Sequence, residues 1–172
     1  MSIKSTSIAI LLLALSLLGF MLGDVMKKQS LTQRDGEIME PSFVEVTIRG
    51  EESQTTREVK VRAEVADTNE KRRQGLSGRE TLPRGGGMLF IFENPCLCGF
   101  WMKEMRFPLD IIWIDEEYRI VHIVEGVSPA TFPETFLPDR AAKYVLEVSA
   151  GTVKDFEVTP GALVEFSDAS SR

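Results

Sequence analysis

The chain has 172 residues, of which 43% are hydrophobic and 27% are charged. These values exclude disorder over most of the length and fit one globular domain with an appendage. The net charge is -6 and the first 23 residues contain no acid, so the rest of the chain is acidic. An acidic surface repels a phosphate backbone, and we therefore expect no nucleic-acid partner.

An uncharged and almost entirely apolar run fills residues 7–23, and Lys4 precedes it. A basic start followed by such a run is what the secretion machinery recognises, and no small-residue cleavage site follows. We expect residues 1–23 to form a hydrophobic helix that anchors the protein in a membrane; the alternative is a cleaved signal peptide. Lys27 and Lys28 leave the orientation open, but we favour a domain outside the cytoplasm, either anchored or secreted or periplasmic after cleavage.

The boundaries of the globular part follow from composition and alternation. Residues 24–41 are polar without periodicity, which predicts a linker. The β-rich domain is expected over residues 42–167, and residues 168–172 are expected to be a disordered tail. Apolar and polar residues alternate over 43–49 and 59–65, which predicts two antiparallel strands with one solvated face.

A short helix is expected after these strands. Asp67 or Thr68 is its predicted N-cap, and Gly75 or Gly78 its end. The glycines at 85–87 have no preceding strand, no following helix and no Lys-Ser/Thr pair, so they predict a turn rather than a phosphate-binding loop.

The second half of the domain is predicted to consist mostly of short strands. They are expected at residues 88–92, 97–102, 111–115, 119–125, 144–148 and 163–166. A proline-rich loop over 129–138 separates the last two from the rest, and a second short helix is expected within 150–157. Together these elements indicate an α+β fold, a compact and mainly antiparallel, barrel-like β domain with two short helices, preceded by the N-terminal hydrophobic helix.

Cys96 and Cys98 lie close to Met102 in the sequence. Sulfur ligands suit Cu(I), but a clear third ligand is missing, so we predict no metal site and keep copper handling as a weak alternative. The two cysteines could also be inert thiols, form a disulfide or take a redox role. The single histidine, His122, lies on an apolar strand face, and we interpret it as a core residue. No cofactor is expected.

Residues 100–115, FWMKEMRFPLDIIWID, combine large aromatic side chains with charges of both signs. Aromatic walls with a few convergent polar groups are typical of a small-ligand pocket. The alternative is structural, with the tryptophans in the core and Asp110 capping a turn. Because a buried charge needs a partner, Lys103 or Arg106 is expected to pair with Asp110 or Glu104.

Four strings occur in order between Val65 and Phe166: VADTNEKRRQGLSGRE, LPRGGGMLFIF, FWMKEMRFPLDIIWID and AAKYVLEVSAGTV. They closely resemble the domain of unknown function 192 family of bacteria and archaea. The resemblance implies a compact β-rich domain, often behind a signal sequence or anchor, and it supplies no activity, cofactor or catalytic residue. Glu104 stands where the family commonly has asparagine, and Cys96 and Cys98 stand where no cysteine is expected.

Several polar positions that match the family's pattern could line a shared site. They are Arg72, Arg79, Lys103 and Asp110. Two arginines and a lysine suit a carboxylate or phosphate group, and with Trp101 as an aromatic wall they form the predicted ligand-binding set. Glu147 also matches the pattern.

We therefore expect a membrane-tethered or exported binding or accessory module, rather than an enzyme, for a small anionic ligand or a partner protein. One alternative is an envelope hydrolase in which Asp110 and Glu104 act as acid and base. The other is a copper-handling protein. The missing nucleophile motif and the single histidine favour the binding module.

Overall fold

The computed structural model describes residues 41–49 and 58–168. The predictions made for residues 1–40, including the hydrophobic helix, and for residues 169–172 lie outside this part. Among the described residues, no helix combines the length and the apolar character needed to cross a membrane.

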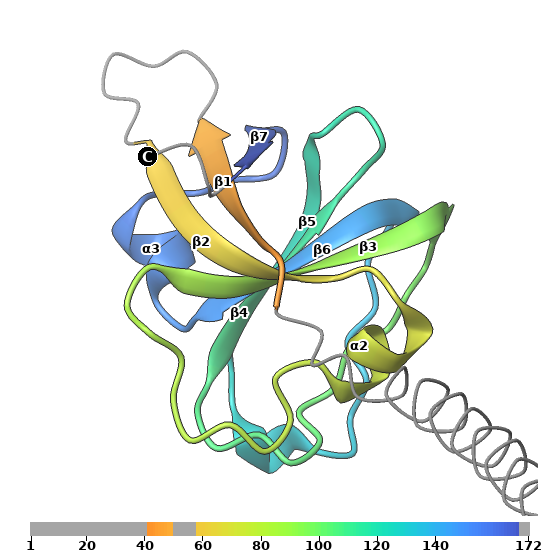
Figure 1. Cartoon of the computed structure of the whole chain (residues 1–172), viewed down its shortest axis with the longest axis vertical. Helices are drawn as coiled ribbons and strands as arrows, with labels where there is room; N and C mark the ends of the chain where they lie inside the picture. The colour runs from red at the N-terminus through yellow and green to blue at the C-terminus, as the bar shows by residue number, and fades with distance from the viewer. Residues whose placement is uncertain (1–40, 50–57, 169–172) are drawn as a thin grey trace, which may run out of the picture. The chain divides into compact units, whose positions relative to one another are not determined.

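The described residues form one seven-stranded sheet with two short helices (Figure 1). The strands are β1 (Phe43–Arg49), β2 (Val59–Ala66), β3 (Gly86–Cys96), β4 (Leu109–Ile114), β5 (Ile120–Val127), β6 (Ala142–Ser149) and β7 (Leu163–Asp168). Their order across the sheet is β5-β4-β6-β3-β2-β1-β7, and every neighbouring pair is antiparallel except β2 and β3. The helices are α2 (Asn69–Gln74) and α3 (Thr152–Asp155), with a 3-10 turn, η1 (Pro129–Thr131). The predicted α+β class is confirmed.

The parallel pair exists because α2 lies in the connection between β2 and β3. Thr68 is the N-cap of α2, and its side chain accepts a hydrogen bond from the backbone N–H of Lys71 at 3.2 Å. Gly75 ends the helix with φ +51°, a conformation that favours glycine. Both predicted caps are therefore confirmed.

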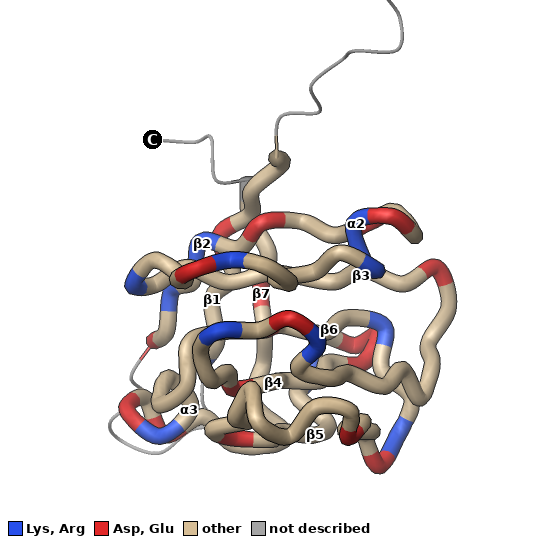
Figure 2. The backbone as a smooth tube through the Cα atoms, turned by 90° about the horizontal axis from the view of Figure 1, so that it is seen from below, with Lys and Arg blue, Asp and Glu red and all other residues tan. Residues whose placement is uncertain are grey.

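The sheet curls until its two edges meet at one end. The backbone N–H of Ile120 donates to the carbonyl of Ala162 at 3.0 Å, and the N–H of Val164 donates to the carbonyl of Tyr118 at 2.8 Å. Figure 2 shows the result as two layers, with β2, β3 and α2 in one and β4, β5 and α3 in the other. The barrel-like part of the prediction is thus a curled sheet whose edge strands touch.

Apolar side chains pack on both faces of β3, β4 and β6. Leu89, Ile112 and Leu146 lie inside the curl, in a cluster that also contains residues of β1, β2 and β7. Their sequence neighbours Phe90 and Val145 point to the opposite face. There they meet a second apolar cluster beneath α2 and the segment after β3. Central strands of a covered sheet bury both faces, so these strands are nearly continuous in apolar residues.

One predicted strand is wrong. Residues 97–102 form a loop, in which Phe100 pairs with Phe136 of the proline-rich loop through two backbone hydrogen bonds, at 2.9 and 2.8 Å. The strand predicted at 88–92 is longer instead, from Gly86 to Cys96. A Cβ on Gly99 would lie 2.5 Å from the Thr135 methyl group, so this loop packs tightly against the proline-rich loop.

Candidate functional site

A pocket of about 310 Å³ opens between the end of α2 and the loop 98–105; we call it the α2 pocket. Phe90 and Phe92 of β3, together with Phe100, Trp101 and Met105 of the loop, line it. Glu147 of β6 is the one acidic residue in its lining. The pocket lies on the second apolar cluster, on the face of the sheet opposite to the inside of the curl.

The aromatic wall is held by contacts between rings. Phe100 meets Phe90 edge-on with ring centroids 4.8 Å apart, and it meets the buried Trp113 in the same way at 5.9 Å. Trp101 is 52% exposed and packs against Phe132, with centroids 5.8 Å apart, so it forms the rim. Edge-to-face pairs of this kind fix ring orientation, and the wall is therefore preformed.

Glu147 carries the unusual chemistry of the pocket. On either side of it in the sheet lie Met88 of β3 and Ile111 of β4, both buried. The Glu147 side chain has no hydrogen bond or ion pair within the described part of the chain, although the residue is only 6% exposed. No fully occluded side-chain oxygen in that part lacks a partner. The carboxyl oxygens of Glu147 therefore open into the pocket.

Burial raises the pKa of Glu147 from an ordinary 4.5 to about 8. The cause is desolvation, which penalises the charged carboxylate, and no neighbouring cation counteracts it. At neutral pH the free protein thus holds a protonated carboxyl group in an aromatic pocket. Strongly shifted acids in clefts are typical of functional sites.

Arg72 lines the α2 pocket, as Trp101 does, but its guanidinium is committed to the backbone. Nη1 donates to the carbonyl oxygens of Asp67 and Ile91 at 2.7 and 2.6 Å, and Nη2 donates to Oδ1 of Asn69 at 2.7 Å. These bonds tie α2 to β3. Arg72 therefore supports one wall of the pocket.

Two other residues of the predicted set lie outside the lining of the α2 pocket. Arg79 pairs with Glu64 of β2 at 2.6 Å. Lys103 is exposed and stands 3.9 Å from Glu104 across their charged groups. The predicted pairing of Lys103 with Glu104 is thus present, as a solvent-exposed contact of little energetic weight.

Asp110 is completely buried and lies on the other face of the sheet. Its two oxygens accept hydrogen bonds from the backbone N–H groups of Gly126, at 2.8 Å, and Val153, at 2.9 Å. The second bond caps α3, whose own N-cap residue is glycine and has no side chain to do so. The sequence analysis offered a structural role for Asp110, the capping of a turn. The role is indeed structural, but the capped element is α3. The suggested acid–base pair of Asp110 with Glu104 is not assembled.

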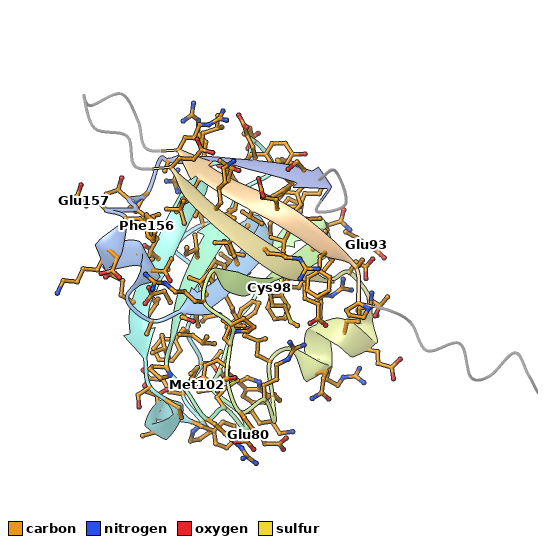
Figure 3. The ribbon with its side chains drawn as sticks, turned by 60° about the vertical axis from the view of Figure 1, so that its left-hand side comes forward. Glu80, Glu93, Cys98, Met102, Phe156 and Glu157 are labelled. Atoms are coloured by element: carbon orange, nitrogen blue, oxygen red, sulfur yellow. A yellow bond between two sulfur atoms is a disulfide. The ribbon has the colours of Figure 1, made fainter. Side chains whose placement is uncertain are left out.

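Cys96 and Cys98 form a disulfide at the end of β3, with Cα atoms 5.1 Å apart. Figure 3 shows Cys98 beside the β3 ribbon, where it reaches the α2 pocket. In this state the pair offers no thiolate, and Met102 is buried in the second apolar cluster. Among residues 41–49 and 58–168, no group of three His, Cys, Asp or Glu side chains comes together as metal ligands would. The copper alternative has no assembled site in this state.

His122 is less buried than a core residue would be. Its Nδ1 lies 3.0 Å from Oδ2 of Asp139, and its ring meets Trp113 edge-on at 5.4 Å. The expectation of a core histidine is therefore wrong in detail, because Asp139, directly after the proline-rich loop, brings a carboxylate to the strand.

Glu147 is the site residue that reasoning from the sequence missed. The alternation of Tyr144, Leu146 and Val148 is typical of a strand with one apolar face, and it does not indicate that the face with Glu147 is covered. Val145 on that second face was the available signal, because an apolar residue on both faces indicates a central, covered strand.

Comparison with solved structures gives the same fold. A protein of Sinorhizobium meliloti, described as a candidate transcription regulator, is 30% identical, with a TM-score of 0.69 over 76% of this chain and 98% of that one. A protein of unknown function from Novosphingobium aromaticivorans is 27% identical, with a TM-score of 0.67 over 75% and 89% of the two chains.

Sequence comparison points to one family. UPF0127 protein TK1120 of Thermococcus kodakarensis is 25% identical over 64% of this chain and 68% of its own length. A UPF0127 protein of Thermococcus gammatolerans is 27% identical over 60% and 65%. The sequence profile of domain of unknown function 192, described as uncharacterized ACR, matches residues 51–166. The resemblance seen in the sequence is thus confirmed, and the chain belongs to the domain of unknown function 192 family.

Proposed function

We propose that the domain is a small-molecule binding module and that the α2 pocket is its ligand site. The observation that carries the proposal is Glu147, a buried carboxyl group without a partner in the described residues that opens into an aromatic-walled pocket. A buried polar group without a partner costs free energy. A ligand that hydrogen-bonds to the Glu147 carboxyl group recovers that cost. If the residue had only a structural role, an apolar side chain at this position would make the fold more stable.

The anionic group expected on the ligand would pair with Arg73 in this proposal. Arg73 lines the pocket, is exposed, and has no hydrogen bond or ion pair to the described residues. Arg72 is occupied by Asp67, Asn69 and Ile91. A free guanidinium at the rim suits a carboxylate or phosphate at the outer end of a ligand.

We also propose that the module is membrane-tethered or exported, and the apolar run of residues 7–23 supports this. Carbonate extraction of membranes separates a tethered from a released form, and protease treatment of intact cells shows on which side the domain lies. A domain protected in intact cells and degraded after lysis would contradict the outside placement.

A nucleic-acid role, such as the description of the Sinorhizobium protein suggests for that protein, is not carried into the proposal. The net charge of this chain is -6, and the acidic residues follow the apolar run. Because phosphate backbones select basic surfaces, a ligand pocket suits the chain better.

The test uses four six-carbon probes that differ only in their polar ends: 1-hexanol, hexanoate, hexylamine and 6-aminohexanoate. We expect saturable binding of at least one of them to the full-length chain by isothermal titration calorimetry. The control is Met105→Trp, which fills the pocket from a half-buried position and should abolish binding while the protein stays folded. Absence of binding by all four would contradict a small-molecule site and favour the partner-protein alternative.

A further inference from the structure

The inner end of the α2 pocket has an environment that favours a positive charge. Glu147 lies there between Met88 and Ile111, neither of which can ionise or donate a hydrogen bond through its side chain. Both carboxyl oxygens open into the pocket, and no described residue donates to them. A ligand group placed against Glu147 would therefore supply a hydrogen-bond partner that no described residue supplies.

The charged residues around the pocket leave this position open. Arg72 and Arg73 of α2 are the basic residues in the lining. Arg72 donates three hydrogen bonds, to Asp67, Asn69 and Ile91. Neither arginine influences the pKa of Glu147, whose rise has burial as its cause. The two arginines thus do not supply the missing counter-charge of Glu147.

The remaining walls accept a cation rather than an anion. Phe90, Phe92, Phe100 and Trp101 surround the pocket, and the face of an aromatic ring attracts a cation through its quadrupole. The last turn of α2, Arg73 to Gly75, also lines the pocket, and the carboxyl end of a helix carries a partial negative charge. An anionic head placed against Glu147 would meet the aromatic rings and the Glu147 carboxyl, which repels an anion once it has lost its proton.

We propose that the ligand of the α2 pocket is a small amphiphilic amine whose protonated nitrogen pairs with Glu147 and whose carbon chain lies against the aromatic wall. This inference rests on the proposed binding function and names its ligand class. An acidic group at the outer end of the same molecule would reach Arg73, which makes an amine with a distant carboxylate the best-matched form. In the free protein Glu147 is protonated; binding of the ammonium ion transfers that proton to solvent.

The experiment extends the six-carbon series. Hexylamine and 6-aminohexanoate should each bind at least tenfold more tightly than 1-hexanol or hexanoate at pH 7.5. Because Glu147 must lose a proton, the affinity of the amines should rise by about tenfold per pH unit from pH 6 until the pKa of Glu147, about 8. Titrations in phosphate and in Tris, whose ionisation enthalpies differ, should show release of nearly one proton per amine bound.

The variant Glu147→Gln keeps the size of the side chain and removes the charge. It should weaken amine binding by at least tenfold and abolish proton release, while 1-hexanol binding changes little. Glu147→Asp, which keeps the charge on a shorter side chain, should retain proton release. Preference for 1-hexanol or hexanoate over the amines would overturn the proposed ligand class, while the pocket would remain a binding site. Absence of binding by all four probes would overturn both.

Discussion

Asp110 and Glu147 are two buried acids on neighbouring strands, and they are treated in opposite ways. Asp110 of β4 lies inside the curl and accepts hydrogen bonds from Gly126 and Val153. Glu147 of β6 lies on the outer face and has no partner among the described residues. Backbone N–H groups satisfy both carboxyl oxygens of Asp110, whereas burial without such donors leads Glu147 to hold its proton. The first therefore builds the fold, and the second is available for a ligand.

The same contrast recurs in the adjacent arginines of α2. Arg72 is half-buried and holds two carbonyl oxygens and one side-chain oxygen. Arg73 is exposed and has no such contact in the described part. A charged group that is hydrogen-bonded within the fold indicates a structural role. A charged group at a pocket without a partner among the described residues indicates a role in ligand binding. The predictions below test this distinction.

Replacement of Asp110 should have the largest effect. Asp110→Ala removes two charge-assisted hydrogen bonds and leaves two backbone N–H groups without a partner inside the domain, so we expect the free energy of unfolding to fall by about 4 kcal/mol. Urea denaturation at pH 7 measures it. The control is Asp115→Ala: Asp115 also accepts from two backbone N–H groups, of Glu117 and Arg119, but near solvent, and about 1 kcal/mol is expected. Equal losses of stability in the two variants would contradict a special structural role for Asp110.

Glu147 should make the protein less stable as the pH rises. The unfolded chain ionises this group near pH 4.5, and the folded chain keeps the proton until about pH 8, so unfolding releases a proton in between and stability falls with pH across that window. The shift corresponds to roughly 5 kcal/mol as an upper limit. Because the oxygens reach solvent through the pocket, about 3 kcal/mol is expected.

The measurement compares Glu147→Gln with the wild type by urea denaturation at several pH values. The variant should lack the fall between pH 4.5 and 8 and should be the more stable protein at pH 8. Glu93→Gln, the same change on an exposed position of β3 (Figure 3), should follow the wild type. A wild type whose stability is flat across this window would show that Glu147 has a partner in solution.

Replacement of Arg72 should lower the free energy of unfolding more than replacement of Arg73, and both losses should be smaller than that of Asp110→Ala. Arg72→Ala frees α2 from the carbonyl of Ile91, and a loss of about 2 kcal/mol is expected. Arg73→Ala should change stability by less than about 0.5 kcal/mol, because an exposed side chain without a partner contributes little. Thermal and urea unfolding of both variants decide it. If Arg73 proves as important as Arg72, then Arg73 cannot be the free cation of the rim.

Arg79 should show the smallest effect. Its ion pair with Glu64 is partly exposed, so Arg79→Ala is expected to cost about 0.5 kcal/mol, and the cost should shrink in high salt. A double-mutant cycle with Glu64→Ala isolates the pair. Binding of the six-carbon probes should be unchanged, since Arg79 does not line the α2 pocket.

The sequence by itself determined the fold class, the family and most of the local elements. Alternation predicts β1 and β2, and Thr68 and Gly75 mark the ends of α2, because caps and strand periodicity depend on neighbours in the chain. Only part of the candidate site could be predicted from the sequence. Arg72 and Trp101 do lie at one pocket, but residue type cannot tell a committed guanidinium from a free one.

Only the tertiary structure decided that Asp110 is hydrogen-bonded and that Glu147 has no partner among the described residues. Asp110 and Glu147 occupy similar apolar strands, and their difference arises from what the sheet order places beside them. The curl brings Gly126 and α3 to Asp110, while α2 and the loop after β3 leave a space over Glu147. Those neighbours are distant along the chain, and the partners of a side chain are set by packing rather than by local sequence.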